Sequence, residues 1–222
     1  MHAALYHNYR LLQKVFLKVK NIVHYKLFFM KTYLIFLSTL IINSSIGQTW
    51  TKNFDYVDES TTGLAKVQKN KKIGFVDPKG KLVVPLVYDD AFPFAEGLAA
   101  VKSGYKWGFV DMEGNMVIPP KYDDAYSFNE GFAKVEKQSH AGFIDKTGKE
   151  VISLVYSHAG RFSDGLAPVC NDKELWGYVD KNGKEVIRFN YAYANSFSEG
   201  IAHVIKNGKE IIIDKSGKET AE

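Results

Sequence analysis

A unit of about 34 residues recurs along most of this chain, and it constrains the fold more than any other feature. A glycine recurs at steps of 34, 34, 34 and 35 residues, at Gly63, Gly97, Gly131, Gly165 and Gly200. Alanine follows each glycine after two residues and valine after four. Short repeated units bury their apolar faces by stacking on their neighbours, so a single unit is not expected to be stable alone.

The array comprises four complete units, at about residues 72–101, 106–135, 140–169 and 175–204, with partial units at 54–67 and 209–219. We expect positions that match between units to encode packing. The clearest recurring residues are Trp107, Gly108, Asp111, Gly114, Tyr122, Phe128, Gly131, Trp176, Gly177 and Asp180.

Each unit predicts three short strands rich in valine, isoleucine and aromatic residues, for example Gly97–Lys102, Lys106–Asp111 and Met116–Pro119. No helical apolar period is sustained after residue 50. The predicted fold is therefore all-β, with tandem units of antiparallel strands stacked as an open β-superhelix or solenoid. A propeller-like closed array is the alternative, although propeller blades usually need four strands.

The connections have their own chemistry. A recurring Asp-x-x-Gly segment, as in Asp111 to Gly114, predicts a type I turn capped by the aspartate, with the glycine left-handed. Prolines such as Pro119 are expected to end the third strand, after which the chain crosses to the next unit. Gly108 lies in mid-strand, so we expect another backbone or a ring, such as that of Tyr122 or Phe128, to pack closely there.

The positive net charge of +4 comes from one end of the chain. Of 29 basic residues six lie in 1–47, where there is no acidic one, which leaves 23 basic against 25 acidic residues in the remainder. A nearly neutral array has no electrostatic footprint for nucleic acid, so we expect no nucleic-acid partner.

The N-terminal region predicts export. Residues 30–48 have a basic start at Lys31, a short apolar run from Tyr33 to Ile42 and a small-residue exit, the three parts of a secretory signal peptide. We expect cleavage near Gly47-Gln48 and residues 1–29 to be an over-extended start. The apolar run is shorter than the roughly 20 residues of a membrane span, so we expect membrane contact only before cleavage. The array, residues 49–222, is then periplasmic or at the cell surface.

No catalytic or metal-binding constellation stands out. Cys170 has no matched base and is expected to be a structural thiol. The recurring aspartates, including the pairs Asp89-Asp90 and Asp123-Asp124, are expected to cap turns and loops rather than to bind calcium or cleave glycosides. Histidines beyond the signal region share no ligand spacing. We therefore expect no enzyme activity, no metal and no cofactor.

The repeat resembles the WG-repeat family, also called KWG repeats. The resemblance rests on Lys106–Asp111 and Leu175–Asp180, and it extends through Tyr122-Asp123-Asp124-Ala125 and Phe128–Ala133 to most of residues 54–219. Departures include Ile73 and Ala141 in place of tryptophan. The resemblance implies a β-rich repeat protein of bacterial type, often exported, without a shared catalytic activity and suited to binding another macromolecule.

A function particular to this chain should reside where the units differ. Tyr126 and Tyr193 lie in the predicted crossing segments and are candidates for exposed rings, whereas Trp107 and Trp176 are expected in the core. The other candidate binding residues differ between units: His158, Arg161, Arg188, Asn195 and His140.

Two functions follow from these observations. The first is a non-enzymatic exported scaffold that mediates protein–protein interaction at the cell envelope. The alternative is a carbohydrate- or cell-wall-binding module, motivated by the aromatic content of 14%. A row of exposed rings at the repeat spacing would favour the glycan, and buried rings would count against it.

Overall fold

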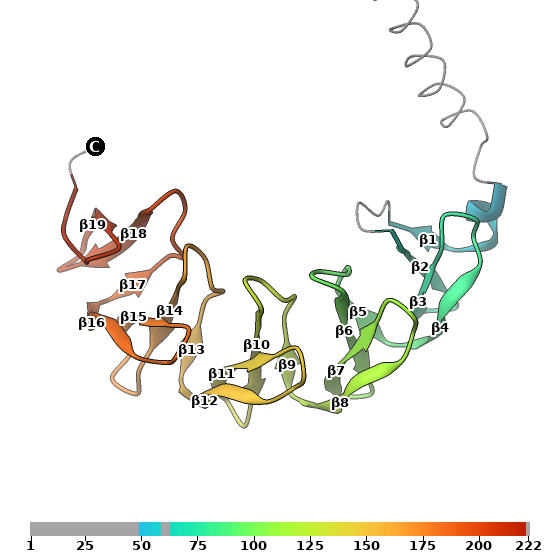
Figure 1. Cartoon of the computed structure of the whole chain (residues 1–222), viewed down its shortest axis with the longest axis horizontal. Helices are drawn as coiled ribbons and strands as arrows, with labels where there is room; N and C mark the ends of the chain where they lie inside the picture. The colour runs from blue at the N-terminus through green and yellow to red at the C-terminus, as the bar shows by residue number, and fades with distance from the viewer. Residues whose placement is uncertain (1–48, 59–62, 221–222) are drawn as a thin grey trace, which may run out of the picture. The chain divides into compact units, whose positions relative to one another are not determined.

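The computed structural model describes residues 49–58 and 63–220, so the predicted signal peptide and the proposed over-extended start lie outside the described residues. A 3-10 helix, η1 (Thr49–Asn53), precedes five small antiparallel sheets, which follow one another in chain order as an open row (Figure 1). The all-β open array is therefore confirmed. The described residues contain no helix with the length and hydropathy that a membrane span requires.

Four of the five sheets have four strands, and the last has three. The first sheet contains β1 (Tyr56–Val57), β2 (Ala65–Lys69), β3 (Lys72–Val76) and β4 (Leu82–Tyr88). The second contains β5 (Asp90–Ala91), β6 (Leu98–Ser103), β7 (Lys106–Asp111) and β8 (Met116–Tyr122). The third contains β9 (Asp124–Ala125), β10 (Phe132–Lys137), β11 (His140–Asp145) and β12 (Glu150–Tyr156).

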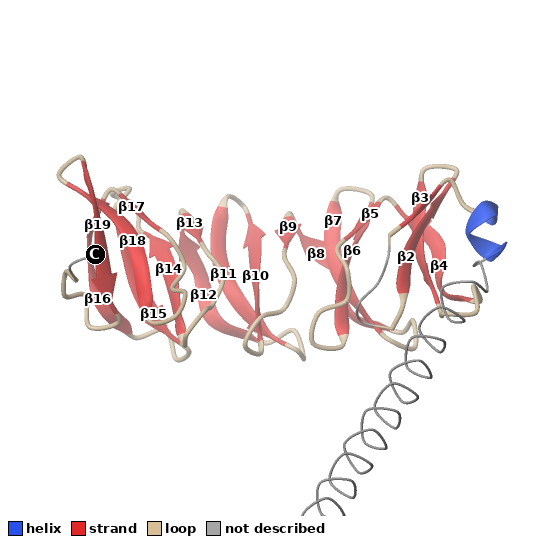
Figure 2. Cartoon of the chain, turned by 90° about the horizontal axis from the view of Figure 1, so that it is seen from above, coloured by secondary structure: helices blue, strands red, loops and turns tan. Residues whose placement is uncertain are grey.

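The remaining strands continue the same pattern. The fourth sheet contains β13 (His158–Ala159), β14 (Leu166–Cys170), β15 (Trp176–Asp180) and β16 (Glu185–Tyr191). The fifth contains β17 (Tyr193–Ala194), β18 (Ile201–Lys206) and β19 (Lys209–Asp214). Figure 2 shows the strands of each sheet lying side by side, with their turns at the two rims.

The prediction of three strands per unit was wrong, because the segment after the recurring tyrosine adds a short fourth strand. In the second sheet Asp90 and Ala91 pair with Lys102 and Val101. The chain crosses between sheets in the short step from one sheet's last strand to the next sheet's first, as from Tyr122 to Asp124. The predicted crossing therefore occurs, and its first residues join the sheet that follows.

The expectation that proline ends the third strand was also wrong. Strand β8 runs through Pro119 and Pro120 to Tyr122. In its pairing with β7, Ile118 lies opposite Phe109 and Tyr122 opposite Trp107, so three residues on β8 lie across from the single residue Gly108 on β7. The prolines lie within this bulge, where their missing N–H groups remove no ladder hydrogen bond.

The bulge explains the mid-strand glycine. A Cβ on Gly108 would lie 2.4 Å from the carbonyl oxygen of Ile118 and 2.7 Å from the nitrogen of Pro120. The close neighbour is thus the backbone of the adjacent strand, which confirms the first of the two predicted alternatives; the second, a tyrosine or phenylalanine ring, was wrong.

The predicted turns are confirmed. Asp111 Oδ1 accepts hydrogen bonds from the amides of Glu113 at 3.1 Å and Asn115 at 2.7 Å, and Gly114 has a φ of 87°. Asp123 caps a different hairpin, because its Oδ2 accepts the Gln138 amide at 2.7 Å. These aspartates therefore act as turn caps, as the sequence predicted.

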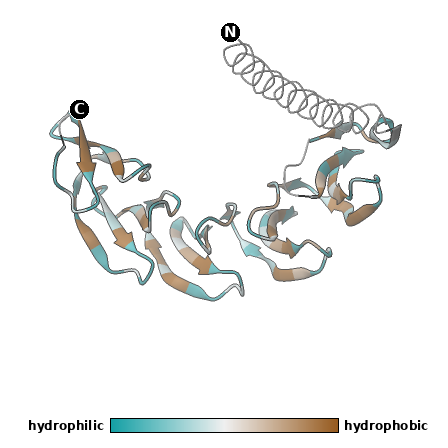
Figure 3. Cartoon of the chain, turned by 45° about the horizontal axis from the view of Figure 1, so that its top comes forward, coloured by the Kyte–Doolittle hydropathy of each residue, from teal (hydrophilic) through white to brown (hydrophobic). Residues whose placement is uncertain are grey.

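The core consists of separate layers between successive sheets. The layer between the second and third sheets joins Phe109 and Ile118 to Phe128 and Val135. Neighbouring residues of one strand face different layers, as Leu98 and Ala99 do. Apolar residues accordingly follow the strands while the turns are hydrophilic (Figure 3). Each inner sheet is covered on both faces.

Helix η1 caps the first sheet. The turn glycines Gly148 and Gly183 each lie against an isoleucine of the preceding sheet, Ile118 and Ile152 respectively. At the corresponding Gly80 the neighbour is the ring of Trp50. Trp50 therefore takes the place that a residue of a preceding sheet occupies elsewhere in the array.

Candidate functional site

The structure has a cavity of about 540 Å³ where the crossing segments of three successive units meet. Its walls include Phe92 after β5, Tyr126 after β9, Phe132 and Lys134 on β10, and Arg161 and Phe162 after β13. Tyr126 and Arg161 were candidates from sequence, so the structure brings two of them into one site. We call this site the crossing pocket.

Tyr126 forms the aromatic wall of the crossing pocket. Its ring centroid lies 6.0 Å from that of Phe92 with an interplanar angle of 31°, and Lys134 Nζ lies 3.7 Å from the Tyr126 ring centroid. Its hydroxyl donates a hydrogen bond to Asp124 Oδ2 at 2.9 Å. Burial, and then the Asp124 carboxylate, raise the pKa of Tyr126 to about 12. The phenol is therefore neutral at physiological pH.

Arg161 is exposed at the rim of the crossing pocket. Its backbone carbonyl accepts a hydrogen bond from Ser196 Oγ at 2.9 Å, which holds this loop to the next unit. Within residues 49–58 and 63–220 its guanidinium has no ion-pair partner. Lys134, by contrast, is paired with Glu136 at 3.0 Å. Lys134 and Arg161 are the charged residues that line the pocket, and both are basic.

Gly160 helps to keep the crossing pocket open. It occupies the repeat position of Phe92, Tyr126 and Asn195, all of which have side chains. A Cβ on Gly160 would lie 2.6 Å from Pro168 Cγ, so Pro168 excludes a side chain there. This unit consequently leaves space beside Tyr126.

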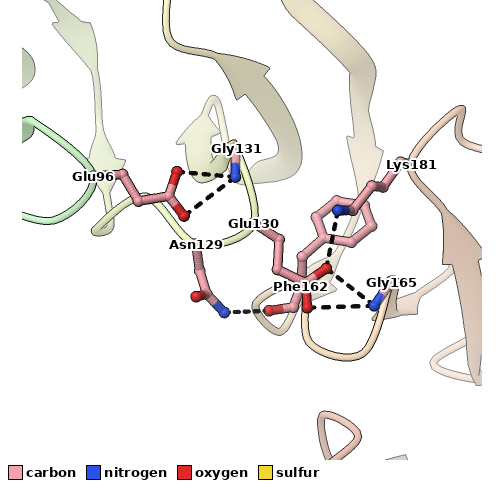
Figure 4. Close-up of polar contacts among 7 residues, drawn as sticks. All are labelled: Glu96, Asn129, Glu130, Gly131, Phe162, Gly165 and Lys181. Carbon is pink, nitrogen blue, oxygen red and sulfur yellow. Dashed lines mark hydrogen bonds and ion pairs between the residues drawn. The ribbon is translucent and has the colours of Figure 1, made fainter.

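Contacts between units hold the pocket walls in place (Figure 4). Asn129 Nδ2 donates a hydrogen bond to the Phe162 carbonyl, and the Glu130 carboxylate accepts one from the Gly165 amide at 3.0 Å. Lys181 Nζ pairs with the same carboxylate at 3.1 Å. The loop that carries Arg161 and Phe162 is thus fastened to the preceding unit.

This fastening repeats along the array as an acidic ladder, formed by Glu96, Glu130 and Asp164. Glu96 accepts from the Gly131 amide at 3.0 Å and Asp164 from the Gly200 amide at 2.7 Å. Each of these acidic residues has a left-handed backbone with φ between 52° and 54°. The recurring pair of an acidic residue and a glycine therefore links units as well as forming a turn.

The other sequence candidates lie outside the crossing pocket. The His158 ring stacks on Trp176 at 6.4 Å and 10°, and Tyr193 lies 5.6 Å from Trp176, so these residues form a second aromatic group. The Asn195 side chain is exposed near the fifth sheet, His140 is the first residue of β11, and Arg188 is exposed on β16. These last three residues are not brought together with the crossing pocket.

Sequence reasoning missed Lys134, Phe92 and Phe132. The units differ at the position of Lys134, where Ala100, Pro168 and His203 stand, so the rule that function follows differences between units could have found it. Phe92 shares a repeat position with Tyr126 and offered the same signal. Phe132 stands where other units have Leu98, Leu166 and Ile201, so only its aromatic ring was unusual.

The remaining candidate chemistry is accounted for by packing. Trp107 is buried as expected, whereas Trp176 is half-buried. Cys170 is a buried free thiol. The part of the chain that the structure describes contains no group of three or more His, Cys, Asp or Glu side chains placed to hold a metal ion.

Comparison with known protein families identifies the repeat. The model of the WG-containing repeat matches four successive segments, residues 73–107, 107–139, 142–174 and 176–209. No curated protein matches the chain in sequence.

Similar solved structures share low identity with the chain. The computationally designed protein Ika8 is 12% identical, with a TM-score of 0.49 over 73% of this chain and 60% of its own. Hsv2 of Kluyveromyces lactis is 12% identical, with a TM-score of 0.48 over 72% and 60%. BamB from Moraxella catarrhalis is 12% identical, with a TM-score of 0.46 over 73% and 59%. The chain thus spans about three fifths of the structures it resembles.

Proposed function

This chain belongs to the WG-containing repeat family, and from that premise we propose that it is a non-enzymatic repeat scaffold that binds another protein at the cell envelope. The observation that carries this proposal is the crossing pocket, where residues that differ between units come together on an otherwise regular array. Repeat arrays present extended surfaces of this kind to macromolecular partners. The pocket has the size range and the aromatic lining typical of binding sites.

The proposed location at the envelope rests on the signal-peptide pattern of residues 30–48. Export would place the array in the periplasm or at the cell surface. Cys170 is buried and, as the single cysteine of the sequence, has no second cysteine in this chain with which to form a disulfide. A compartment assay with a C-terminal tag on the full chain tests the location directly.

A glycan partner is the second candidate. Tyr193, whose side chain is 46% exposed, and the His158–Trp176 stack offer rings for a sugar. The repeat position of Tyr193, however, carries Asp90, Asp124 and His158 in other units. Tyr56 shares this repeat position with Tyr193, but the two lie in the first and last sheets, and Tyr105 lies in a hairpin turn. The exposed tyrosines therefore do not form the continuous row that a polysaccharide would track, which favours the protein partner.

The test is a cross-linked pull-down with the tagged full chain as bait against the envelope fraction of the source organism. We expect one protein in stoichiometric amount, with cross-links at the crossing pocket. Recovery of cell-wall polymer without protein would replace the scaffold with the carbohydrate-binding module.

A further inference from the structure

The crossing pocket combines an apolar interior with the positive charge of Arg161, which has no ion-pair partner among the described residues. Five aromatic residues line it, Phe92, Tyr126, Phe128, Phe132 and Phe162. The ring centroids of Phe132 and Phe162 lie 5.1 Å apart, so a second pair of neighbouring rings lines the pocket in addition to Phe92 and Tyr126. An aromatic interior of about 540 Å³ has room for a large apolar side chain.

Arg161 sets the charge preference of the pocket rim. Its guanidinium is exposed and has no carboxylate partner among the described residues, whereas Lys134 is engaged with Glu136 and with the Tyr126 ring. A planar guanidinium binds a carboxylate through two parallel hydrogen bonds. No acidic residue lines the pocket in the part of the chain that the structure describes.

The pocket is preformed rather than assembled by its ligand. Asn129 and Ser196 hold the Phe162 and Arg161 carbonyls from the units on either side, and Glu130 holds the Gly165 amide. Pro168 keeps position 160 free of a side chain. A preformed site pays little ordering cost on binding, which suits an anchor residue of a partner.

We infer that the crossing pocket receives an aromatic or large aliphatic side chain from an acidic segment of a partner protein, with Arg161 binding a carboxylate beside that anchor. This inference rests on the proposed function, since it names the chemistry of the protein partner. Arginine and aromatic residues in such a central pocket commonly supply most of an interface's binding energy.

The test uses the purified full chain and a fluorescein-labelled peptide in which one phenylalanine is flanked on both sides by acidic residues. Two matched peptides replace the phenylalanine with alanine or the acidic residues with lysine. We expect the acidic aromatic peptide to bind, its affinity to fall with added salt, and the two matched peptides to bind much more weakly.

Arg161→Ala should weaken binding of the acidic aromatic peptide roughly tenfold, because it removes a charged hydrogen-bond pair. The affinity of Arg161→Lys for this peptide should lie between those of Arg161→Ala and the natural protein. Lysine keeps the positive charge but cannot form the two parallel hydrogen bonds of a guanidinium. Arg188→Ala, at another exposed arginine, is the matched control and should leave binding unchanged. Circular dichroism checks that all three variants fold.

The inference would be overturned if the lysine-substituted peptide bound as tightly as the acidic aromatic peptide. It would also be overturned if Arg161→Ala bound the acidic aromatic peptide as tightly as the natural protein does. Binding of an oligogalacturonate that depends on Arg161, with no binding of the acidic aromatic peptide, would also overturn the inference. It would indicate an acidic glycan as the ligand. In the pull-down, a partner captured equally by the natural chain and Arg161→Ala would refute the pocket assignment and leave the scaffold standing. Capture of no protein by the natural chain would refute the scaffold itself.

Discussion

The carboxylate of Glu130 accepts a hydrogen bond from the backbone amide of Gly165, 35 residues further along the chain, at 3.0 Å. The same relationship joins Glu96 to Gly131 and Asp164 to Gly200. Units of a repeat array contact only their neighbours, so stability depends on terms of this kind at each junction. The acidic ladder therefore links local turns to the stability of the whole row.

Glu130→Ala should destabilise the protein by about 1–2 kcal/mol, because it leaves the Gly165 amide without its acceptor and removes the Lys181 ion pair. Urea unfolding measures the change. Glu199→Ala is the matched control: Glu199 has the same left-handed backbone, with φ of 54°, but is exposed and has no hydrogen-bond or ion-pair partner among the described residues. Equal losses in the two variants would show that the ladder contributes nothing.

Gly108→Ala should destabilise the protein by about 3 kcal/mol, because its Cβ would lie 2.4 Å from the Ile118 carbonyl oxygen. Gly131→Ala provides the comparison, since a Cβ there meets nothing within 4 Å but φ is 89°. Backbone strain alone should lower the free energy of unfolding of Gly131→Ala by about 1–2 kcal/mol. Thermal unfolding of both variants checks the order, and a larger loss for Gly131→Ala would contradict the close approach at the bulge.

Trp50→Ala should loosen the first sheet selectively. The Trp50 ring covers Gly80 where inner units have a residue of the preceding sheet. Repeat arrays lose structure from their ends, so amide exchange should rise in β2 and β3 and stay unchanged in β14 and β15. Hydrogen exchange with peptide resolution measures this. Uniform acceleration along the chain would mean that η1 has no capping role.

Stability should fall in acid as the turn aspartates protonate. Hydrogen bonds from Thr147, and then from backbone amides, lower the pKa of Asp145, and turn hydrogen bonds likewise lower those of Asp111, Asp180 and Asp214. An aspartate with a lowered folded-state pKa stabilises the fold above its unfolded value of about 3.9, and this contribution is lost as pH falls through the folded pKa. The urea midpoint should therefore drop below about pH 4.

Replacing these four aspartates with asparagine should flatten that acid dependence while keeping the turns. Asn171 shows that the amide oxygen suffices, since its Oδ1 accepts the amides of Lys173 at 3.0 Å and Leu175 at 3.1 Å. Asp172→Asn is the control, because Asp172 lies in the loop of Asn171 and its carboxylate accepts no turn hydrogen bond among the described residues. An unchanged acid slope in the fourfold variant would place the acid sensitivity elsewhere.

Much of the fold was predictable because its signals are local. The Asp-x-x-Gly turn at Asp111 closes within five residues, and its hydrogen bonds are those expected from the sequence. The bulge at Pro119 and Pro120 was not predictable in the same way, because proline also ends strands. Which outcome occurs depends on whether Gly108 on the facing strand admits the backbone.

The candidate site was only partly predictable. Differences between units pointed to Tyr126 and Arg161, which lie 35 residues apart and meet in the crossing pocket. The same differences pointed to His140 and Arg188, which lie elsewhere. Position within the repeat does not say which differing residues share a cavity, because that depends on how successive sheets are placed.

The sequence by itself determined the repeat, the all-β class, the turns and most of the buried residues. Those properties depend on residue spacing within one unit, where neighbours in sequence are neighbours in space. Tertiary structure alone decided that Glu130 reaches Gly165, that Trp50 caps the first sheet and that Gly160 leaves a cavity beside Tyr126. Each of these depends on the distance between atoms of different units, which is set only when the sheets pack against one another.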